Sequence, residues 1–389
     1  MSAEDKNQAM NQPPEPYWRE SVSFTSYPAL SEDAEVDIAI VGGGIAGITA
    51  GYELAKQGKN VAIIEANSIL NGTTGHTTAK ITAQHGLIYD ELIQHFGLDL
   101  TKTYYQANDD ALQYIKKNVS DLKIECDLTE EDAYVYSTTE KYDQKVRKEF
   151  TAYSKLGIDG ELVEQLPINL EIKSAVVMKK QAQYHPLKYL KVLVEEFTKN
   201  GGTIYENTTA VDIQEGNNPV IVTRDGHKLT CSNVLICSHF PFFDGKGFYF
   251  TKMYASRSYI LGVKAKQEFP GGMYLNAENP TRSLRYTDVN GEKLILVGGD
   301  DHKAGQGKDT VKHYEALQEY AESVLGVAEI PYRWSAQDLI SVDKVPYIGQ
   351  LTSNHKNIFV ATGFKKWGMT SGTAAGMILS DLIIKKAST

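Results

Sequence analysis

The chain has 389 residues, of which 42% are apolar, and its formal net charge is −9. This length suits two domains or one domain with a large insertion, and the apolar share is enough for an ordinary core. The acidic balance argues against binding to nucleic acid and against retention on anionic lipid by charge.

The sequence carries no sign of export or membrane insertion. Residues 1–15 are polar and contain Pro13 and Pro14, so they lack the apolar region of a signal peptide. No apolar run of about 18 residues occurs, and we therefore expect no membrane span. The three cysteines form no C-x-x-C pair, which argues against a disulfide framework and a metal knuckle. We therefore expect a cytoplasmic protein.

Residues 1–34 precede the first predicted strand and are expected to form an N-terminal arm. The second half of this arm contains Tyr17, Trp18, Phe24 and Tyr27. Disordered tails are poor in aromatic residues. We therefore predict that residues 16–34 are ordered and pack on the body of the protein.

The most informative stretch, residues 36–67, reads VDIAIVGGGIAGITAGYELAKQGKNVAIIEAN. An apolar strand leads into a G-x-G-x-x-G turn at Gly42, Gly44 and Gly47, and a helix and a second strand then end at Glu65. This is the complete βαβ dinucleotide-binding fingerprint, in which a pyrophosphate lies at the helix N-terminus. Glu65 is placed to accept hydrogen bonds from an adenosine ribose and would repel a 2′-phosphate. FAD or NAD is therefore expected rather than NADP.

A loop rich in glycine and threonine follows, with the sequence NGTTGHTTAKITA over residues 71–83. Threonine hydroxyls and exposed backbone N–H groups suit a second contact with a phosphate or a flavin. We therefore predict that this loop completes the nucleotide site.

The rest of the chain alternates predicted helices and strands. Helices are expected at residues 92–119, 141–156, 186–199 and 310–325, and from Thr370 onward. Strands are expected at residues 176–178, 203–206, 210–213, 220–223, 229–237 and 358–361. Residues 248–297 alternate in polarity, which indicates an antiparallel sheet. The Gly-rich segment 298–307 does not match G-x-G-x-x-G, so no second nucleotide site is expected.

The fingerprint, the TTGHTTAK loop and the C-terminal TGFKKWGMTSG turn together carry a family resemblance. On these motifs the chain resembles the FAD-dependent amine and amino-acid oxidoreductases, the group of D-amino-acid oxidase, glycine oxidase and sarcosine oxidase. It looks closest to a bacterial subset that often carries a Rieske iron–sulfur domain after the last helix. No Rieske ligand motif is present in these 389 residues.

This resemblance implies an α/β fold, with an FAD-binding Rossmann-like domain and an interleaved substrate domain built on an antiparallel sheet. The FAD-binding domain would be discontinuous and consist of residues 35–100, 183–245 and 336–389. The substrate domain would consist of residues 101–182 and 246–335.

The resemblance also implies which residues hold FAD. Val211 matches the position that touches the adenine, and the CSHFPF turn with Ser238 stands where the family usually has an Ala-Gly pair near the flavin. Residues 363–370 open a helix toward the flavin pyrimidine, where a helix N-terminus stabilises negative charge. The predicted cofactor-binding residues are Gly42, Gly43, Gly44, Ile45, Ala46, Gly47, Glu65, Ala66, Thr73, Thr74, Gly75, His76, Thr77, Thr78, Ala79, Val211, Ser238, Gly363, Lys366, Trp367, Gly368, Met369 and Thr370.

The mode of flavin attachment is open. In dimethylglycine and sarcosine dehydrogenases, a histidine in a similar loop is joined covalently to the flavin, and His76 resembles it. This chain has Gly75 where those relatives have tryptophan. Covalent attachment and a non-covalent contact through His76 both remain possible.

The resemblance implies hydride transfer from a C–H group beside an amine or hydroxyl to flavin N5, with the protein supplying position and electrostatics. The predicted catalytic residues are Lys80, Arg285 and Lys366. Arg285, or alternatively Arg257, could pair with a substrate carboxylate. The two lysines could steer oxygen or substrate.

Two further groups of residues are weighed for the pocket. Tyr254, Tyr259, Tyr274 and Tyr286 could line it. Asp300, Asp301 and His302 are interpreted as a solvated loop rather than a metal site, because no further ligand follows at close spacing. No metal is therefore expected.

Three functions are open at this stage. The first is an FAD-dependent oxidoreductase that oxidises a small amine or amino acid and passes electrons to oxygen or to an iron–sulfur partner. The second is a flavin electron-transfer module that serves a Rieske domain or partner protein. The third is an NAD-binding dehydrogenase, against which the C-terminal turn argues.

Overall fold

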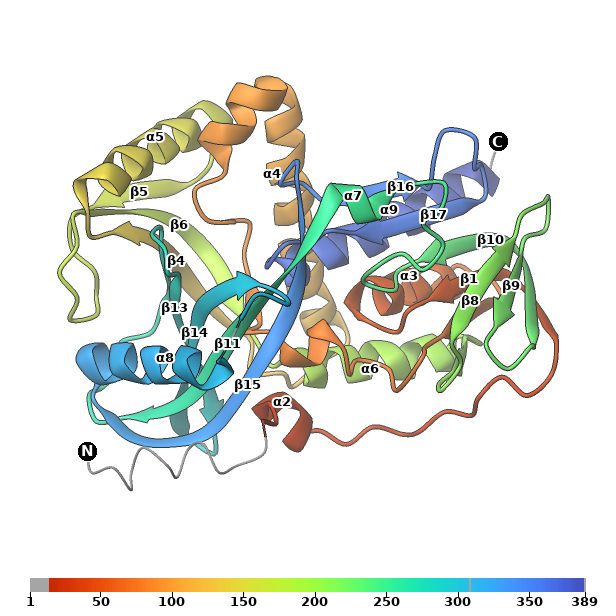
Figure 1. The fold of residues 1–389 in the computed structure, drawn as a ribbon, viewed down its shortest axis with the longest axis horizontal. Coiled ribbons are helices and arrows are strands. Elements are labelled where there is room, and N and C mark those ends of the chain that lie inside the picture. The colour runs from red at the N-terminus through yellow and green to blue at the C-terminus, as the bar shows by residue number, and fades with distance from the viewer. Residues whose placement is uncertain (1–13, 308, 388–389) are drawn as a thin grey trace.

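The computed structural model describes residues 14–307 and 309–387. Two sheets divide the molecule, one in each half of Figure 1, with helices on their outer faces. Residues 1–13 of the predicted arm and the last two residues of the predicted FAD-binding domain lie outside the described residues. Within the described part, each helix is too short or too polar to cross a bilayer.

The first sheet has eight strands and holds the dinucleotide fingerprint. Its order is β16-β17-β10-β1-β2-β7, and β9 and β8 extend it from β10. The central strands β17, β10, β1, β2 and β7 are parallel. The strands are β1 (Ala34–Val41), β2 (Val61–Ile64), β7 (Thr203–Tyr205), β8 (Ala210–Gln214), β9 (Val220–Thr223), β10 (Lys228–Ile236), β16 (Tyr347–Gln350) and β17 (Ile358–Thr362).

Helix α3 (Ile45–Lys56) packs against α6 (Pro186–Lys199) and α9 (Gly368–Ala387) beside this sheet. The apolar runs of β1 and β2 are buried because helices and neighbouring strands cover them, as expected for a parallel sheet. The predicted βαβ unit is confirmed.

The second sheet has nine strands in the order β15-β11-β14-β13-β12-β4-β6-β3, with β5 paired to β6. Its pairs are antiparallel except for β12 with β4. The strands are β3 (Lys80–Ile81), β4 (Thr129–Ser137), β5 (Gly160–Val163), β6 (Ser174–Gln183), β11 (Met253–Ala265), β12 (Met273–Asn276), β13 (Arg282–Val289), β14 (Glu292–Lys303) and β15 (Val327–Ser341). The predicted interleaved, largely antiparallel sheet is therefore confirmed.

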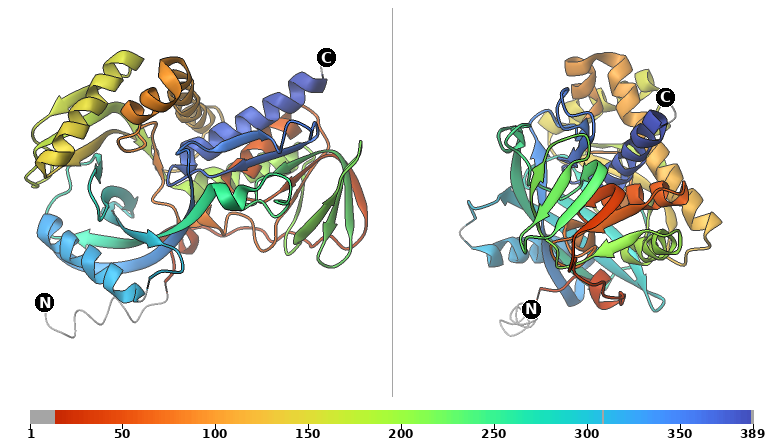
Figure 2. Two further views of the ribbon diagram at one scale, coloured as in Figure 1. Left: turned by 45° about the horizontal axis from the view of Figure 1, so that its top comes forward. Right: turned by 90° about the vertical axis from the view of Figure 1, so that its right-hand side faces the viewer.

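Helices α5 (Glu140–Leu156) and α8 (Thr310–Leu325) cover opposite ends of the second sheet, as the left view of Figure 2 shows. Helix α4 (Tyr89–Asp121) lies between the two halves and packs on α9 and α5. It begins earlier than predicted and bends at Gly97, whose φ is +80°. The short helix α7 (Tyr249–Lys252) precedes β11.

Sequence reasoning missed two features of the second sheet. Strand β15 was not predicted, because Pro331 and several charged residues interrupt its apolar pattern. Residues 298–303 were treated as a separate Gly-rich segment, whereas they continue β14.

The described part of the predicted N-terminal arm, residues 14–34, packs on the body of the protein. Helix α2 (Tyr17–Glu20) buries Tyr17 and Trp18, and the Trp18 indole N–H donates to the Thr77 carbonyl at 2.7 Å. Phe24 and Tyr27 pack on the same core. The prediction that residues 16–34 pack on the body is confirmed.

The predicted domain boundaries do not coincide with the ends of elements. Helix α4 runs across residue 100, and β15 runs across residue 335. Strand β3 lies in the predicted FAD-binding segment but pairs with β6 of the second sheet. We keep the discontinuous division as a proposal.

Candidate functional site

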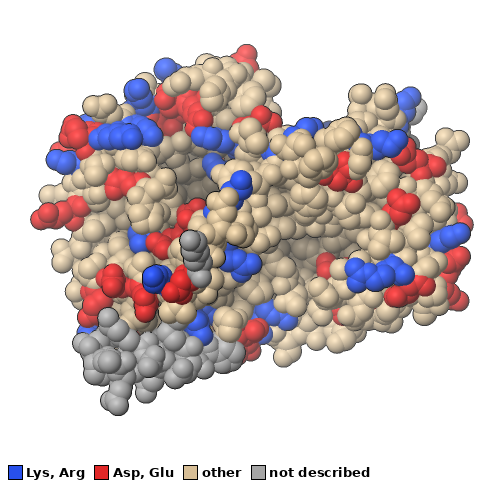
Figure 3. Space-filling view, in the orientation of Figure 1, with Lys and Arg blue, Asp and Glu red and all other residues tan. Residues whose placement is uncertain are grey.

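A cavity of about 1090 Å³ lies between the two sheets. The turns after β1 and β2 line one end, and β11, β14 and β15 line the other. Residues of α4 and α5 also line it, among them Glu91, Lys145 and Lys148. Figure 3 shows the surface hollowed between the parts that hold α5 and α8. Ordinary small-molecule pockets span about 300–1,000 Å³, so this cavity suits a dinucleotide together with a smaller molecule.

The glycine turn packs too closely against neighbouring backbone to accept a side chain at Gly42 or Gly47. Gly42 has a φ of +112°, and a Cβ there would lie 2.4 Å from the Cys237 carbonyl oxygen. A Cβ at Gly47 would lie 2.0 Å from the Gly42 oxygen. Of the predicted residues, Gly42, Gly44, Ile45 and Ala46 line the cavity, whereas Gly43 and Gly47 are not in its lining. The unpaired N–H groups of the first turn of α3 are therefore available to an anion.

Glu65 lies at the end of β2 and lines the cavity with Ala66. Its two carboxylate oxygens accept hydrogen bonds from the backbone N–H groups of Gly43 at 2.9 Å and Asn67 at 3.0 Å. A carboxylate oxygen has further lone pairs. The geometry thus leaves acceptor capacity for a ribose hydroxyl.

The Gly-Thr loop forms a short 3-10 helix, η1 (Thr73–His76), beside α3. The Thr74 hydroxyl accepts the Ile45 N–H at 3.1 Å and ties the loop to that helix. Gly75 and Ala79 are outside the lining; Gly75 packs on Leu70, whose oxygen would lie 2.4 Å from a Cβ at this position, and Ala79 is fully buried. The predicted residues that line the cavity are Thr73, Thr74, His76, Thr77 and Thr78.

The C-terminal turn reaches the same cavity from the opposite side. Lys366, Trp367, Gly368 and Met369 line it, and α9 begins at Gly368. Gly363 and Thr370 were predicted to touch the cofactor, but they lie outside the lining. The Thr370 hydroxyl instead donates to the Thr82 carbonyl at 3.0 Å.

His85 is a cavity residue that sequence reasoning missed. Its ring stacks on Trp367 with centroids 4.9 Å apart, and its Nδ1 lies 2.6 Å from the Tyr104 hydroxyl. Burial lowers the pKa of His85 to about 3, so the ring is neutral. A single histidine in a loop gives no signal from which this stacking could be predicted.

Two predicted contacts on the first sheet have different outcomes. Ser238 lines the cavity, and its hydroxyl donates to the Phe240 carbonyl at 2.9 Å. The Val211 side chain is exposed and lies outside the lining, whereas its neighbour Ala210 is in it. Val211 is the second residue of β8, and its exposed side chain outside the lining gives no support for the predicted adenine contact.

Lys80 faces the cavity from β3, as predicted for a catalytic residue. Its Nζ donates to the Tyr274 carbonyl at 2.9 Å and to the Ser283 hydroxyl. Burial, and then the charge of Arg285, lower the pKa of Lys80 to about 7. This lysine can therefore change its charge near neutral pH.

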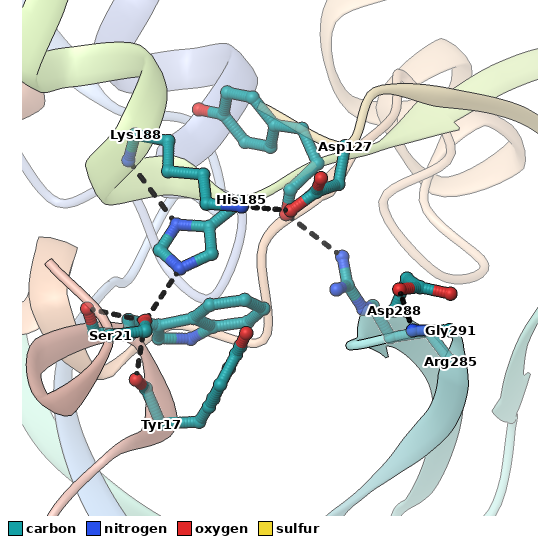
Figure 4. Close-up of polar contacts among 10 residues, drawn as sticks. Tyr17, Ser21, Asp127, His185, Lys188, Arg285, Asp288 and Gly291 are labelled. Carbon is teal, nitrogen blue, oxygen red and sulfur yellow. Dashed lines mark hydrogen bonds and ion pairs between the residues drawn. The ribbon is translucent and has the colours of Figure 1, made fainter. Parts of the chain in front are cut away.

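Arg285 does not occupy the position predicted for a substrate carboxylate. It is fully buried outside the cavity, where its guanidinium donates to the carbonyls of Ala79 at 3.1 Å and Tyr184 at 3.2 Å. It lies over the Trp18 ring, 5.2 Å from the centroid. Figure 4 shows Arg285 in the cluster that joins the arm to His185. Because these carbonyls and the Trp18 ring hold the guanidinium outside the cavity lining, we infer a structural role for Arg285.

The other arginine and tyrosine candidates are mostly engaged elsewhere. Arg257 donates to the Ser335 hydroxyl at 2.9 Å and is outside the cavity lining. Among the four tyrosines only Tyr254 lines the cavity, whereas Tyr259, Tyr274 and Tyr286 do not.

The interpretation of residues 300–302 as a solvated loop is wrong. Asp300 pairs with Arg282 at 2.8 Å and with His313 at 2.6 Å. Asp301 lines the cavity, pairs with Lys366 at 3.0 Å and accepts from the Thr281 hydroxyl. Within the described residues no group of three or more side chains could hold a metal ion.

The comparisons with known proteins agree with this geometry. The family described as "DAO: FAD dependent oxidoreductase" matches residues 37–382. The chain belongs to this family. It is thus an FAD-dependent oxidoreductase of the amine and amino-acid oxidase type, and the NAD-binding alternative is set aside.

A Bacillus subtilis protein described as "Putative Rieske 2Fe-2S iron-sulfur protein YhfW" is 54% identical over 96% of this chain and 73% of its own length. The gamma-glutamylputrescine oxidoreductase of Escherichia coli is 22% identical over 92% of this chain and 86% of its own. The crystal structure of glycine oxidase from Geobacillus kaustophilus superposes with a TM-score of 0.76 at 20% identity, covering 90% of this chain and 95% of that one. This last likeness concerns the fold.

The residues present fit FAD. The Cβ-free cradle at Gly42 and Gly44 and the carboxylate of Glu65 occur at one end of the cavity, where a pyrophosphate and a ribose need them. The start of α9 and Lys366 occur further along, where a flavin needs positive charge. FAD would therefore lie across the cavity with the nine-stranded sheet beside its reactive part.

Proposed function

We propose that this FAD-dependent oxidoreductase oxidises a small amine or amino acid. When bound, FAD supplies the hydride acceptor at N5. The observation that carries the proposal is the single cavity that joins the nucleotide cradle to side chains on β11, β14 and β15. A substrate between this sheet and the flavin would be shielded by Trp367 and Leu339, which line the same cavity.

The chain supplies two kinds of group to this reaction. Below its pKa of about 7, Lys80 places positive charge beside the cavity, which favours negative charge on a reduced cofactor, whereas the charge of Lys366 is balanced by Asp301. The nine-stranded sheet supplies the walls that hold the substrate. Arg285 is excluded from a direct role by its position.

Anaerobic spectroscopy tests this proposal. Primary amines, secondary amines, and the L- and D-enantiomers of amino acids are added in turn to the oxidised, FAD-loaded protein. We expect at least one of these classes of compound to reduce the flavin, which is seen as a loss of its visible absorption band after anaerobic mixing. Retention of the oxidised spectrum with every compound would contradict the proposal.

A second candidate is a flavin module that passes electrons to a Rieske iron–sulfur partner. The name of the 54% identical Bacillus relative favours it. Rapid reduction of a Rieske protein by the photoreduced flavoprotein, together with inertness toward amines and amino acids, would support this alternative.

A cytoplasmic location stays a prediction. The three cysteines are free and buried, which agrees with a reducing compartment. Fractionation of the native host cells, with detection of the protein in the cytosol, tests it.

A further inference from the structure

We propose that the Asp338 carboxylate binds the cationic nitrogen of the substrate, so that the substrate is an amine without a carboxylate beside its reactive carbon. This inference rests on the proposed function and narrows it. It concerns a residue on β15, the strand that sequence reasoning did not predict.

Asp338 is a cavity residue without a partner. It lines the cavity on the same wall as Ser256 and Asp301, on three adjacent strands. Within residues 14–307 and 309–387, no hydrogen bond or ion pair to its side chain is formed. A buried carboxylate that lacks a partner is costly, and a bound cation would remove that cost.

The charged neighbours of Asp338 form their ion pairs and hydrogen bonds with other residues. Lys366 pairs with Asp301 at 3.0 Å, and Asp301 also accepts from Thr281 and, at 3.3 Å, from Ser256. One lysine thus lies among two carboxylates. With both carboxylates ionised this wall carries one uncompensated negative charge, which a substrate ammonium would balance.

The cavity offers no arginine for a carboxylate. Among the described residues of its lining, none is an arginine. The two arginines proposed from the sequence are engaged elsewhere, Arg257 with Ser335 and Arg285 with backbone carbonyls, and Arg282 pairs with Asp300. A bidentate carboxylate clamp is therefore not available in this structure.

Asp338 can also take the proton that amine oxidation must release. Burial raises the pKa of Asp338 to about 7. In this step the ammonium N–H bond breaks, an O–H bond forms on Asp338, and the electron pair stays on nitrogen for hydride loss from the adjacent carbon. The charged and titratable groups around it are Asp301, Lys366 and, beside the Gln337 backbone, His239, whose pKa burial lowers.

A pair of matched probes tests this inference on the holoprotein. tert-Butylammonium has no hydrogen on the carbon beside nitrogen and cannot be oxidised, and pivalate presents a carboxylate on the same tert-butyl group. Binding is followed by calorimetry and by the shift of the flavin absorption band. Because neither probe is turned over, the result does not depend on catalysis.

We expect tert-butylammonium to bind the wild-type protein at pH 8 and to bind about tenfold more weakly to the Asp338→Asn variant, which corresponds to about 1.4 kcal/mol. Asp212→Asn, the same change at an exposed position on β8, is the control and should bind like wild type. Binding to wild type should weaken below about pH 7 as Asp338 is protonated. This pH dependence needs no variant.

Two outcomes would overturn the inference. One is tighter binding of pivalate than of tert-butylammonium, through cavity lysines such as Lys365. The other is equal binding of tert-butylammonium to wild type and Asp338→Asn. Failure of the proposed function shows itself differently, as a flavin that no amine or amino acid reduces although the cation probe binds.

Discussion

The two ends of the cavity are built in different ways. At the nucleotide end, one continuous stretch from β1 to η1 supplies a backbone cradle, and glycines keep side chains out of it. At the substrate end, the cavity is lined by individual side chains from β3, β14, β15 and the turn before α9. The first end is therefore readable from a local motif, whereas the second exists only after distant strands pair.

This difference has a chemical meaning. A cradle of backbone N–H groups recognises phosphate, which is common to dinucleotides. Side chains such as Asp338 and Lys80 recognise and polarise one class of substrate. The following variants distinguish the two ends of the cavity, beginning with the largest expected effect on FAD binding.

The largest effect on FAD binding is expected from Gly44→Ala. A Cβ at Gly44 would meet only the Thr74 hydroxyl, at 3.3 Å, and the φ of −86° suits alanine, so the chain should fold. The added methyl group would face the pyrophosphate, and we expect at least a tenfold loss of FAD affinity, about 1.4 kcal/mol or more. The FAD content of the purified protein and its circular dichroism check this. Gly245→Ala, which has open space around it, should keep full FAD content.

Arg285→Ala should affect stability rather than binding. It leaves the carbonyls of Ala79 and Tyr184 without a donor and opens a gap beside Trp18. We expect the free energy of unfolding to fall by about 3 kcal/mol in denaturant titrations. Arg224→Ala, at an exposed position just after β9, should cost less than about 1 kcal/mol. A loss of tert-butylammonium binding in the folded Arg285→Ala protein would contradict the structural role.

Asp338→Asn should change the pH dependence of stability. The folded-state pKa is raised from 3.8 to about 7, so the native protein holds this proton more tightly than the unfolded chain. The stability that this proton provides is complete below about pH 4 and is lost as the pH rises to about 7. We expect the variant to be more stable than wild type by about 1–3 kcal/mol at pH 8 and equal to it at pH 4. Equal stability at both pH values would show that Asp338 is not destabilised in the fold.

Lys80→Met should lower the two-electron reduction potential of the bound flavin by about 30 mV, which equals a tenfold change in the equilibrium. Lys80 is charged below its pKa of about 7 and neutral above it. The difference between variant and wild type should therefore be present at pH 6 and absent at pH 9. Lys264→Met, at an exposed ion pair with Glu329, is the control. Equal flavin potentials of Lys80→Met and wild type at pH 6 would show that Lys80 does not influence the bound flavin.

The smallest effect is expected from His76→Ala. The His76 ring is held by a contact of 2.9 Å between its Nδ1 and the Gly72 oxygen. We expect acid precipitation of the wild-type protein to release the flavin into the supernatant and the variant to keep at least about half of the FAD. A yellow pellet that turns colourless in the variant would instead establish covalent attachment through His76.

The sequence by itself determined the nucleotide half of the site. The strand, glycine turn, helix and Glu65 follow from local rules of backbone sterics and apolar periodicity, so the βαβ unit could be predicted before folding. The ordered arm was predictable as well, because Tyr17 and Trp18 are too apolar to stay in water.

Only the tertiary structure decided the substrate half. Arg285 and Lys80 both looked catalytic, but Ala79, Tyr184 and Trp18 enclose the Arg285 guanidinium, whereas Lys80 lines the cavity. Asp338 lies on a strand with a weak apolar pattern, and its lack of a partner depends on where β11, β14 and the turn before α9 place their charges. Such a charge environment is a property of long-range strand pairing, which no local sequence pattern records.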